Sequence, residues 1–145
     1  MQVQNVEILR QIDFMILSVA LRSDGIIKVS INANEEIDIG HVVEVVSAIQ
    51  KIGHGKKFPV LIIVGEYTLP TPDARSYVAT EESDPFASAE AYVISSFSQK
   101  LVGNVYLSFN KPARPTRLFN SEEKAVEWLK SFLYFYYFFF KKKAS

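Results

Sequence analysis

A continuous apolar run near the middle of the chain, residues 60–64 (VLIIV), constrains the fold more than any other segment. All five side chains are branched and apolar, so a strand formed here has no face suited to water. Such strands are typical of the centre of a parallel sheet that carries helices on both faces. Because side chains alternate across a strand, we predict that every second residue from Val60 onward faces one helical layer. Leu61 and Ile63 are expected to face the other layer.

The segments on both sides of this run alternate between strand patterns and helical patterns. With their caps included, strands are predicted at 14–21, 26–31, 91–94 and 117–119, and helices at 38–53, 71–82, 95–109 and 121–132. A strand at 105–109 is the alternative for the end of the third helix. Strands joined by single helices are parallel, with right-handed crossovers. The sequence therefore predicts an α/β fold with a single mixed sheet of four to five strands and crossover helices.

Local signals mark the ends of several of these elements. The turn at 23–25 (SDG) separates two β-rich runs and indicates a hairpin. Asp38 and Thr71 can each cap a helix, because their side-chain oxygens can accept hydrogen bonds from free amides of the first turn. Gly53 is typical of a helix C-cap. These signals fix the limits of the first helix and the start of the second.

Three of the predicted helices carry apolar residues at helical spacing, which indicates the side that faces the sheet. The expected inward-facing residues are Ile39, Val42, Val43, Val46 and Ile49 on the first helix, Phe97, Leu101 and Val105 on the third, and Ala125, Trp128, Leu129 and Phe132 on the last.

Charge and cysteine content narrow the classes of partner and cofactor. The 16 basic residues balance 16 acidic ones, so no overall positive field attracts nucleic acid. The absence of cysteine excludes disulfides and thiolate metal ligands, and it fits a reducing compartment. The two histidines, His41 and His54, have no partner at metal-ligand spacing. We therefore expect no metal, no cofactor and no nucleic-acid partner.

Neither a catalytic motif nor a targeting segment stands out in the sequence. The serines at 95, 96 and 98 lack the Gly-x-Ser-x-Gly elbow that would expose and activate a nucleophile. An apolar run at 14–21 follows Glu7 and Asp13, where a signal peptide would be basic. It is also shorter than the about 20 residues that span a bilayer. We expect a cytoplasmic, non-enzymatic protein without a transmembrane segment.

A resemblance to a known family rests on the order of these segments over residues 24–132. Its elements are the strand after Gly25, the helix from Asp38, the VLIIV strand, the helix start TPDAR, the strand AYVI with its following helix, and PTRLF before SEEKAVEWL. This pattern resembles the STAS-like domains (sulfate transporter and anti-sigma factor antagonist), in particular the small stand-alone bacterial SpoIIAA-like proteins. The resemblance implies a four- or five-stranded sheet and a non-enzymatic role in partner binding or regulation. Some relatives are thought to bind apolar ligands.

The chain departs from that family at the helix start after the central strand. Anti-sigma factor antagonists carry an Asp-Ser-Ser/Thr-Gly type sequence there, in which a serine is phosphorylated. Residues 65–73 (GEYTLPTPD) lack this motif, and Thr71 occupies the corresponding place. We interpret Thr71 as a helix cap, with a phosphoacceptor as the alternative.

The C-terminal segment is unusually rich in aromatic residues. Residues 132–140 (FLYFYYFFF) precede Lys141–Lys143 and carry more apolar surface than packing on one sheet can cover. We therefore divide the chain into a domain at 1–132 and a tail at 133–145. We predict a homodimer or larger assembly, with peripheral membrane contact of the tail as the alternative. The predicted interface residues are Phe132, Phe135, Tyr136 and Phe139.

Polar residues gather where the predicted parallel strands end. Ligands and partners of open α/β sheets bind beyond the carboxyl ends of the strands. The residues expected at this edge, which we call the rim, are Glu66, Tyr67, Thr68, Thr71, Ser95 and Ser96. Glu66 and Tyr67 are expected to be its most exposed members. The sequence favours a regulatory or protein-interaction module, and the alternative is a carrier that holds a lipid or other small apolar molecule between helix and sheet.

Overall fold

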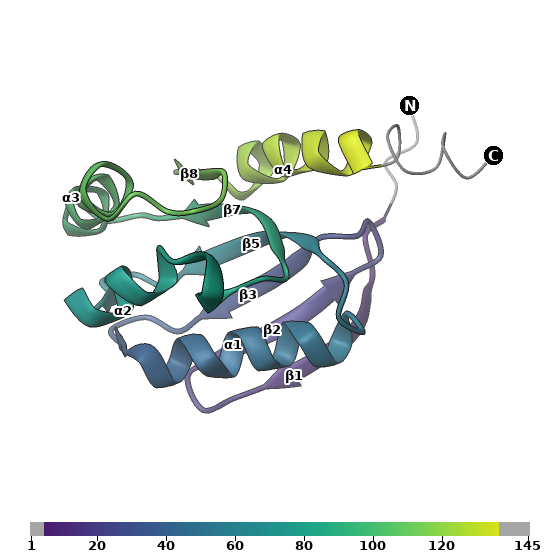
Figure 1. Cartoon of the computed structure of the whole chain (residues 1–145), viewed down its shortest axis with the longest axis horizontal. Coiled ribbons are helices and arrows are strands. Elements are labelled where there is room, and N and C mark those ends of the chain that lie inside the picture. Colours follow the sequence, from purple (N-terminus) through teal and green to yellow (C-terminus); the bar gives the residue numbers. More distant parts are fainter. Residues whose placement is uncertain (1–4, 137–145) are drawn as a thin grey trace.

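A six-stranded mixed sheet forms the centre of the computed structural model, which describes residues 5–136 (Figure 1). The strands run across the sheet in the order β1 (Ile8–Asp13), β2 (Leu17–Arg22), β3 (Ile27–Ile31), β5 (Phe58–Val64), β7 (Ala87–Val93) and β8 (Thr116–Phe119). The pairs β1–β2 and β2–β3 are antiparallel, and the pairs from β3 to β8 are parallel. The predicted α/β class and the parallel centre are confirmed.

The sheet has six strands where four or five were expected, and β1 accounts for the difference. Its sequence, ILRQID, mixes apolar and charged residues, and most of its side chains are exposed at the edge of the sheet. An edge strand of this kind lacks the apolar run that identified the central strands. The predicted first strand at 14–21 is β2, which begins later, at Leu17.

Four α-helices and several short elements connect the strands. The helices are α1 (Ile39–Ile52), α2 (Pro72–Val78), α3 (Phe97–Val105) and α4 (Glu122–Tyr136). The short elements are a two-residue strand pair, β4 (Glu36–Ile37) with β6 (Leu69–Pro70), the 3-10 turn η1 (Glu81–Ser83) and the π-helical turn η2 (Tyr106–Asn110). The predicted caps are confirmed: Asp38 accepts from the His41 amide, Thr71 accepts from the Ala74 amide, and Gly53 ends α1.

Two apolar clusters lie on opposite faces of the sheet. Val60 and Ile62 belong to the cluster that includes Ile49 and Ile52 of α1. Leu61 belongs to the cluster that includes Leu129 of α4, and Ile63 packs against it. Figure 1 shows α1 and α2 on one side of the sheet and α4 on the other. The predicted alternation of the VLIIV strand between two helical layers is therefore confirmed.

The helix α2 is shorter than predicted, ending at Val78 rather than near Glu82. Its end is bound by a residue far along the chain. The Arg114 guanidinium donates to the carbonyls of Val78 and Thr80, each at 2.8 Å. Basic groups that bind the last carbonyls of a helix stabilise its C-terminus. A contact between residues so distant in sequence gives no local signal.

The inward face predicted for the third helix is wrong. Phe97, Leu101 and Val105 are 76%, 52% and 44% exposed. The helix instead turns Gln99 and Gly103 inward, and a Cβ atom at Gly103 would lie only 2.6 Å from Leu118 Cδ1. Close approach of backbone to β8 and hydrogen bonding of Gln99 thus decide the orientation of α3.

The prediction for α1 holds for three of its five residues. Ile49 is buried, and Val42 and Val46 are half-buried and face the space between α1 and the sheet. Ile39 and Val43 are exposed, so the predicted stripe is wider than the face that packs. The stripe predicted for the last helix is confirmed: Ala125 and Leu129 are buried, and Trp128 and Phe132 pack against them.

Candidate functional site

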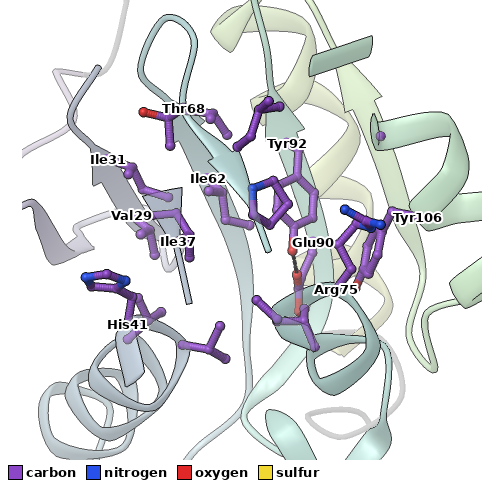
Figure 2. A pocket seen from close by; sticks show the side chains of 18 of the residues that line it. Val29, Ile31, Ile37, His41, Ile62, Thr68, Arg75, Glu90, Tyr92 and Tyr106 are labelled. Carbon is purple, nitrogen blue, oxygen red and sulfur yellow. Dashed lines mark hydrogen bonds between the residues drawn. The ribbon is translucent and has the colours of Figure 1, made fainter. Parts of the chain in front are cut away.

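A cavity of about 160 Å³ lies between the sheet and helices α1 and α2 (Figure 2). Its walls are almost entirely apolar. Val29, Ile31 and Ile62 line it from the strands, and Val42 and Val46 line it from α1. Apolar cavities of about this volume, near 150 Å³, remain dry and can take up a molecule such as benzene. The geometry therefore provides a binding site for a small apolar group.

Glu90 of β7 is the central polar residue at one side of this cavity. Both of its carboxylate oxygens accept hydrogen bonds: Oε1 from Arg114 Nη1 at 3.0 Å and Oε2 from the Tyr92 hydroxyl at 2.5 Å. The Glu90 and Arg114 side chains are only 5% and 6% exposed. Burial raises the pKa of Glu90 above its usual value, and the adjacent Arg114 charge opposes that shift. The pair is a buried ion pair whose hydrogen bonds are satisfied within the protein.

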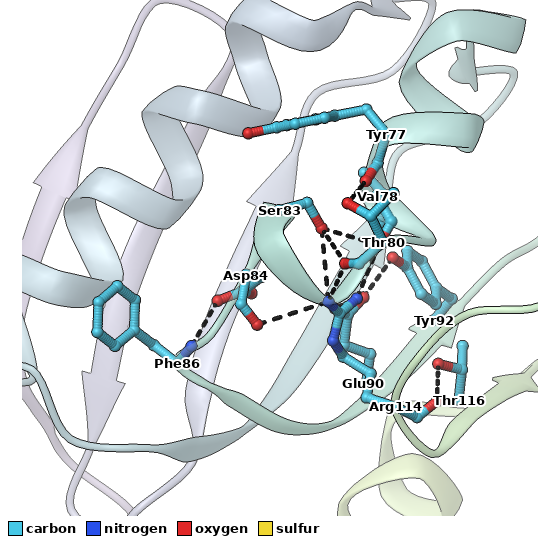
Figure 3. A network of polar contacts seen from close by, with 10 residues as sticks. All are labelled: Tyr77, Val78, Thr80, Ser83, Asp84, Phe86, Glu90, Tyr92, Arg114 and Thr116. Atoms are coloured by element: carbon cyan, nitrogen blue, oxygen red, sulfur yellow. Dashed lines mark hydrogen bonds and ion pairs between the residues drawn. The ribbon is translucent and has the colours of Figure 1, made fainter.

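Arg114 joins this pair to the end of α2 (Figure 3). Besides its bonds to Glu90 and to the Val78 and Thr80 carbonyls, it donates to the Ser83 hydroxyl at 3.4 Å. Nearby Asp84 is also buried, and its Oδ1 accepts from the Phe86 amide at 3.1 Å. Burial raises the pKa of Asp84, against the Phe86 hydrogen bond and the Arg114 charge. This network fixes α2 and η1 against β7.

Two polar groups in the cavity wall make no hydrogen bond of normal geometry with the described residues. They are the Tyr106 hydroxyl and Arg75 Nε, both buried. The Tyr106 ring packs edge-on against Tyr92, with ring centroids 6.0 Å apart. Burial raises the pKa of the Tyr106 phenol well above its usual value, and the Glu90 charge adds to the shift. The hydroxyl therefore keeps its proton and remains a hydrogen-bond donor.

None of these polar residues was among the sites predicted from sequence. Glu90 carried one usable signal, because a carboxylate in the buried strand ASAEAYV needs a partner. Arg114 and Tyr106 gave no comparable signal. Arg114 reaches Glu90 from a loop, and Tyr106 reaches the cavity from a π-helical turn, and the placement of both depends on packing of the whole domain.

The structure brings the two loops of the predicted rim together through Gln99. This buried side chain donates from Nε2 to the carbonyls of Gly65 and Thr68, at 2.8 and 2.9 Å. Its Oε1 accepts from the amides of Ser95 and Ser96. The loop after β5 and the loop after β7 therefore form one hydrogen-bonded surface.

The rim residues themselves differ in exposure and role. Glu66 and Tyr67 are exposed. Thr68 is buried, and its hydroxyl donates to the Asn32 carbonyl and accepts from the Glu35 amide, so it is not available on the surface. Thr71 caps α2. Ser96, rather than Ser95, caps α3 by accepting from the Gln99 amide.

The predicted oligomer interface lies mostly beyond the described part of the chain. Phe132 is half-buried and packs against Trp128, with ring centroids 5.0 Å apart. The side chains of Phe135 and Tyr136 and the whole of Phe139 lie outside what the structure describes. Between residues 5 and 136, no helix is both long enough and apolar enough to cross a membrane.

An exposed apolar stripe follows one side of α3 and η2. Its members, which we call the α3 stripe, are Phe97, Leu101, Val105 and Phe109. Large apolar residues grouped on a surface are typical of protein-contact sites. The stripe begins directly after Ser96, so it continues from the rim.

Comparison with known proteins gives a family but no described function. The family model that matches is described as a domain of unknown function (DUF7793), and it covers residues 20–133. No curated protein matches the chain. No solved structure matches it either.

Proposed function

Since the chain belongs to the DUF7793 family, a domain of unknown function, we propose its role from its cavity: it is a non-enzymatic binding module for a small apolar molecule. The observation that carries this proposal is the apolar cavity between the sheet and α1 and α2. Well-packed protein interiors contain few voids larger than a water molecule. A pocket of about 160 Å³ with apolar walls leaves apolar surface exposed to water, which costs free energy unless a ligand covers it.

The resemblance to STAS-like domains supports the same role, because some of those proteins are thought to bind apolar ligands. The polar groups around the cavity also favour binding over catalysis. The Glu90 carboxylate is held by Arg114 and Tyr92, so it is not free to act as a base on a bound molecule.

Methyl NMR during a titration with toluene tests the proposal. Toluene is a small neutral probe close in size to benzene, which suits a cavity of this volume. We expect shifts in the methyl signals of Val29, Ile31 and Ile62, which line the cavity. The methyl signals of Ile26 and Leu129, on the opposite face of the sheet, should stay unchanged. Equal shifts on both faces, or no shifts, would overturn the proposal.

A matched pair of variants on α1 sharpens this test. Val46→Phe places a larger side chain in the cavity and should abolish the toluene-dependent shifts. Val43→Phe adds the same group at an exposed position of the same helix, outside the cavity, and should leave the shifts intact. Toluene binding that survives Val46→Phe would place the site elsewhere.

The α3 stripe supports a second candidate function, a protein-interaction surface. Its exposed members lie on the helix that Gln99 joins to the loop of Glu66 and Tyr67, since Gln99 donates to carbonyls on both sides of these two residues. Self-association is one kind of protein interaction, and it can be tested with the purified protein alone. Sedimentation velocity over a range of concentrations should show assembly in the wild type and a shift toward monomer in Phe97→Ser/Leu101→Ser. A wild type that remains monomeric throughout contradicts self-association.

A further inference from the structure

The cavity wall contains two hydrogen-bond donors that the protein leaves unused. Tyr106 is 6% exposed, and its hydroxyl makes no hydrogen bond of normal geometry with the described residues, although the Tyr92 hydroxyl lies near enough to lower its pKa. Arg75 Nε is also a buried atom without a partner. Both residues line the cavity, and in Figure 2 they lie on the side away from His41. A buried donor without an acceptor is costly, so it indicates a missing partner.

The acidic residues of the cavity do not supply that partner. Both Glu90 oxygens already accept hydrogen bonds from Arg114 and Tyr92, and Asp84 Oδ1 accepts from the Phe86 amide. Arg114 balances the charge of Glu90 at 3.0 Å. No ion pair within the described part of the chain involves Arg75. Arg75 as a residue is half-buried, and its Nε is the part of the guanidinium that is enclosed without a partner.

Two donors, one of them on a cationic guanidinium, beside an apolar cavity match an acceptor that carries negative charge. A carboxylate meets this requirement, because it accepts several hydrogen bonds and pairs with a guanidinium. We infer that the ligand of the proposed binding function is a small carboxylic acid with an aromatic or short aliphatic body. Its carboxylate binds Arg75 Nε and the Tyr106 hydroxyl, and its body fills the space lined by Val29, Ile62 and Val46.

Isothermal titration calorimetry with a matched pair of ligands tests this inference. Phenylacetate carries the carboxylate, and 2-phenylethanol has the same ring and spacer with a neutral hydroxyl. We expect phenylacetate to bind about tenfold tighter or more, as expected for one hydrogen-bonded charge pair. Arg75→Gln should remove this preference. Tyr106→Phe, which deletes only the hydroxyl, should weaken phenylacetate binding about threefold to tenfold.

Two controls separate the head-group effect from overall charge and from folding. Lys51→Gln removes one positive charge from the exposed end of α1 and should leave the preference unchanged. Arg75→Gln should still bind toluene with the methyl shifts described above, which shows that its cavity remains formed.

The outcomes distinguish this inference from the function on which it rests. Equal affinity for the two ligands, or a preference that survives Arg75→Gln, overturns the carboxylate inference and leaves the apolar binding function standing. Failure of toluene, phenylacetate and 2-phenylethanol alike to bind the wild type overturns both.

Discussion

Arg114 is a residue whose loss should strongly affect the fold, since it binds both Glu90 and the end of α2. Arg114→Met leaves the buried Glu90 carboxylate without a counter-charge. Breaking a buried ion pair from one side costs about 3 kcal/mol or more of unfolding free energy. Urea denaturation should show this loss, whereas Arg117→Met, at an exposed position three residues later, should change stability by less than about 1 kcal/mol. Equal effects of the two substitutions would contradict this role.

Asp84 should make the stability of the domain depend on pH. Burial, opposed by the Phe86 hydrogen bond and the Arg114 charge, raises the pKa of this carboxyl group in the folded state. The folded protein then binds more protons than the unfolded chain, so unfolding free energy falls as pH rises from the unfolded pKa toward the folded one. Asp84→Asn removes this contribution, and the fall in unfolding free energy above about pH 4 should become shallower. Identical slopes in urea denaturation at several pH values would contradict the assignment.

At the scale of single residues, the sequence predicted functions that depend on near neighbours only. Asp38 and Thr71 cap helices as expected, because a cap acts within one turn of its own position. The polar cavity residues were missed because Glu90 and Arg114 meet across 24 positions of sequence. Tyr106 and Arg75 were missed for the same reason, since the cavity that they line exists only after α2 and η2 pack together.

At the scale of elements, hydrophobic spacing predicted α4 correctly and α3 wrongly. The buried face of α4 is apolar because it packs flat against β5 and β7. The inner face of α3 includes Gln99 and Gly103, since it must bond two loops and approach β8 closely. The apolar residues of α3 therefore lie on its outer face, where they form the α3 stripe. An apolar stripe thus indicates a contact surface without saying whether the contact is internal.

The same substitution on these two helices should separate buried from exposed stripes. Leu129→Ala on α4 removes a fully buried side chain, which costs about 2–5 kcal/mol of unfolding free energy. Leu101→Ala on α3 removes a half-exposed one, and stability should change by less than about 1 kcal/mol. Urea denaturation at low protein concentration measures both values without interference from assembly. A large loss in Leu101→Ala would show that the α3 stripe packs internally.

At the scale of the whole molecule, the sheet separates two apolar cores, one packed tightly against α4 and one that contains the cavity beside α1. The face toward α4 presents Ala89 and Ala91, whose small side chains let the helix approach closely. The opposite face presents Val29 and Ile62 to α1 and leaves the cavity beside them. The VLIIV strand belongs to both faces, which explains why this one run predicted the architecture so well. It could not predict the cavity, because the cavity results from the spacing of α1 and α2.

Two side chains, Thr68 and Gln99, link the cavity to the rim, so binding in the cavity should slow opening of the rim. Thr68 and Gln99 line the cavity, and Gln99 holds the Gly65 and Thr68 carbonyls of the rim. Opening this loop must withdraw Gln99 from the cavity wall and release a bound ligand. Toluene at about 100 times its dissociation constant stabilises the closed form by about 2.7 kcal/mol. Hydrogen exchange of the Thr68 amide should therefore slow by up to about a hundredfold.

The amide of Gly25 provides the internal reference for this experiment. It donates to the Arg22 carbonyl in the β2–β3 turn, and neither residue lines the cavity. Its exchange rate should not change with toluene if the turn opens locally. Gln99→Leu keeps an apolar group of similar size at the cavity wall but removes the bonds to the rim, so the effect of toluene on Thr68 should disappear in this variant. If the Thr68 amide exchanges at the same rate with and without toluene while the Val29 and Ile62 methyl signals shift, the cavity fills independently of the rim, and the two surfaces act as separate sites.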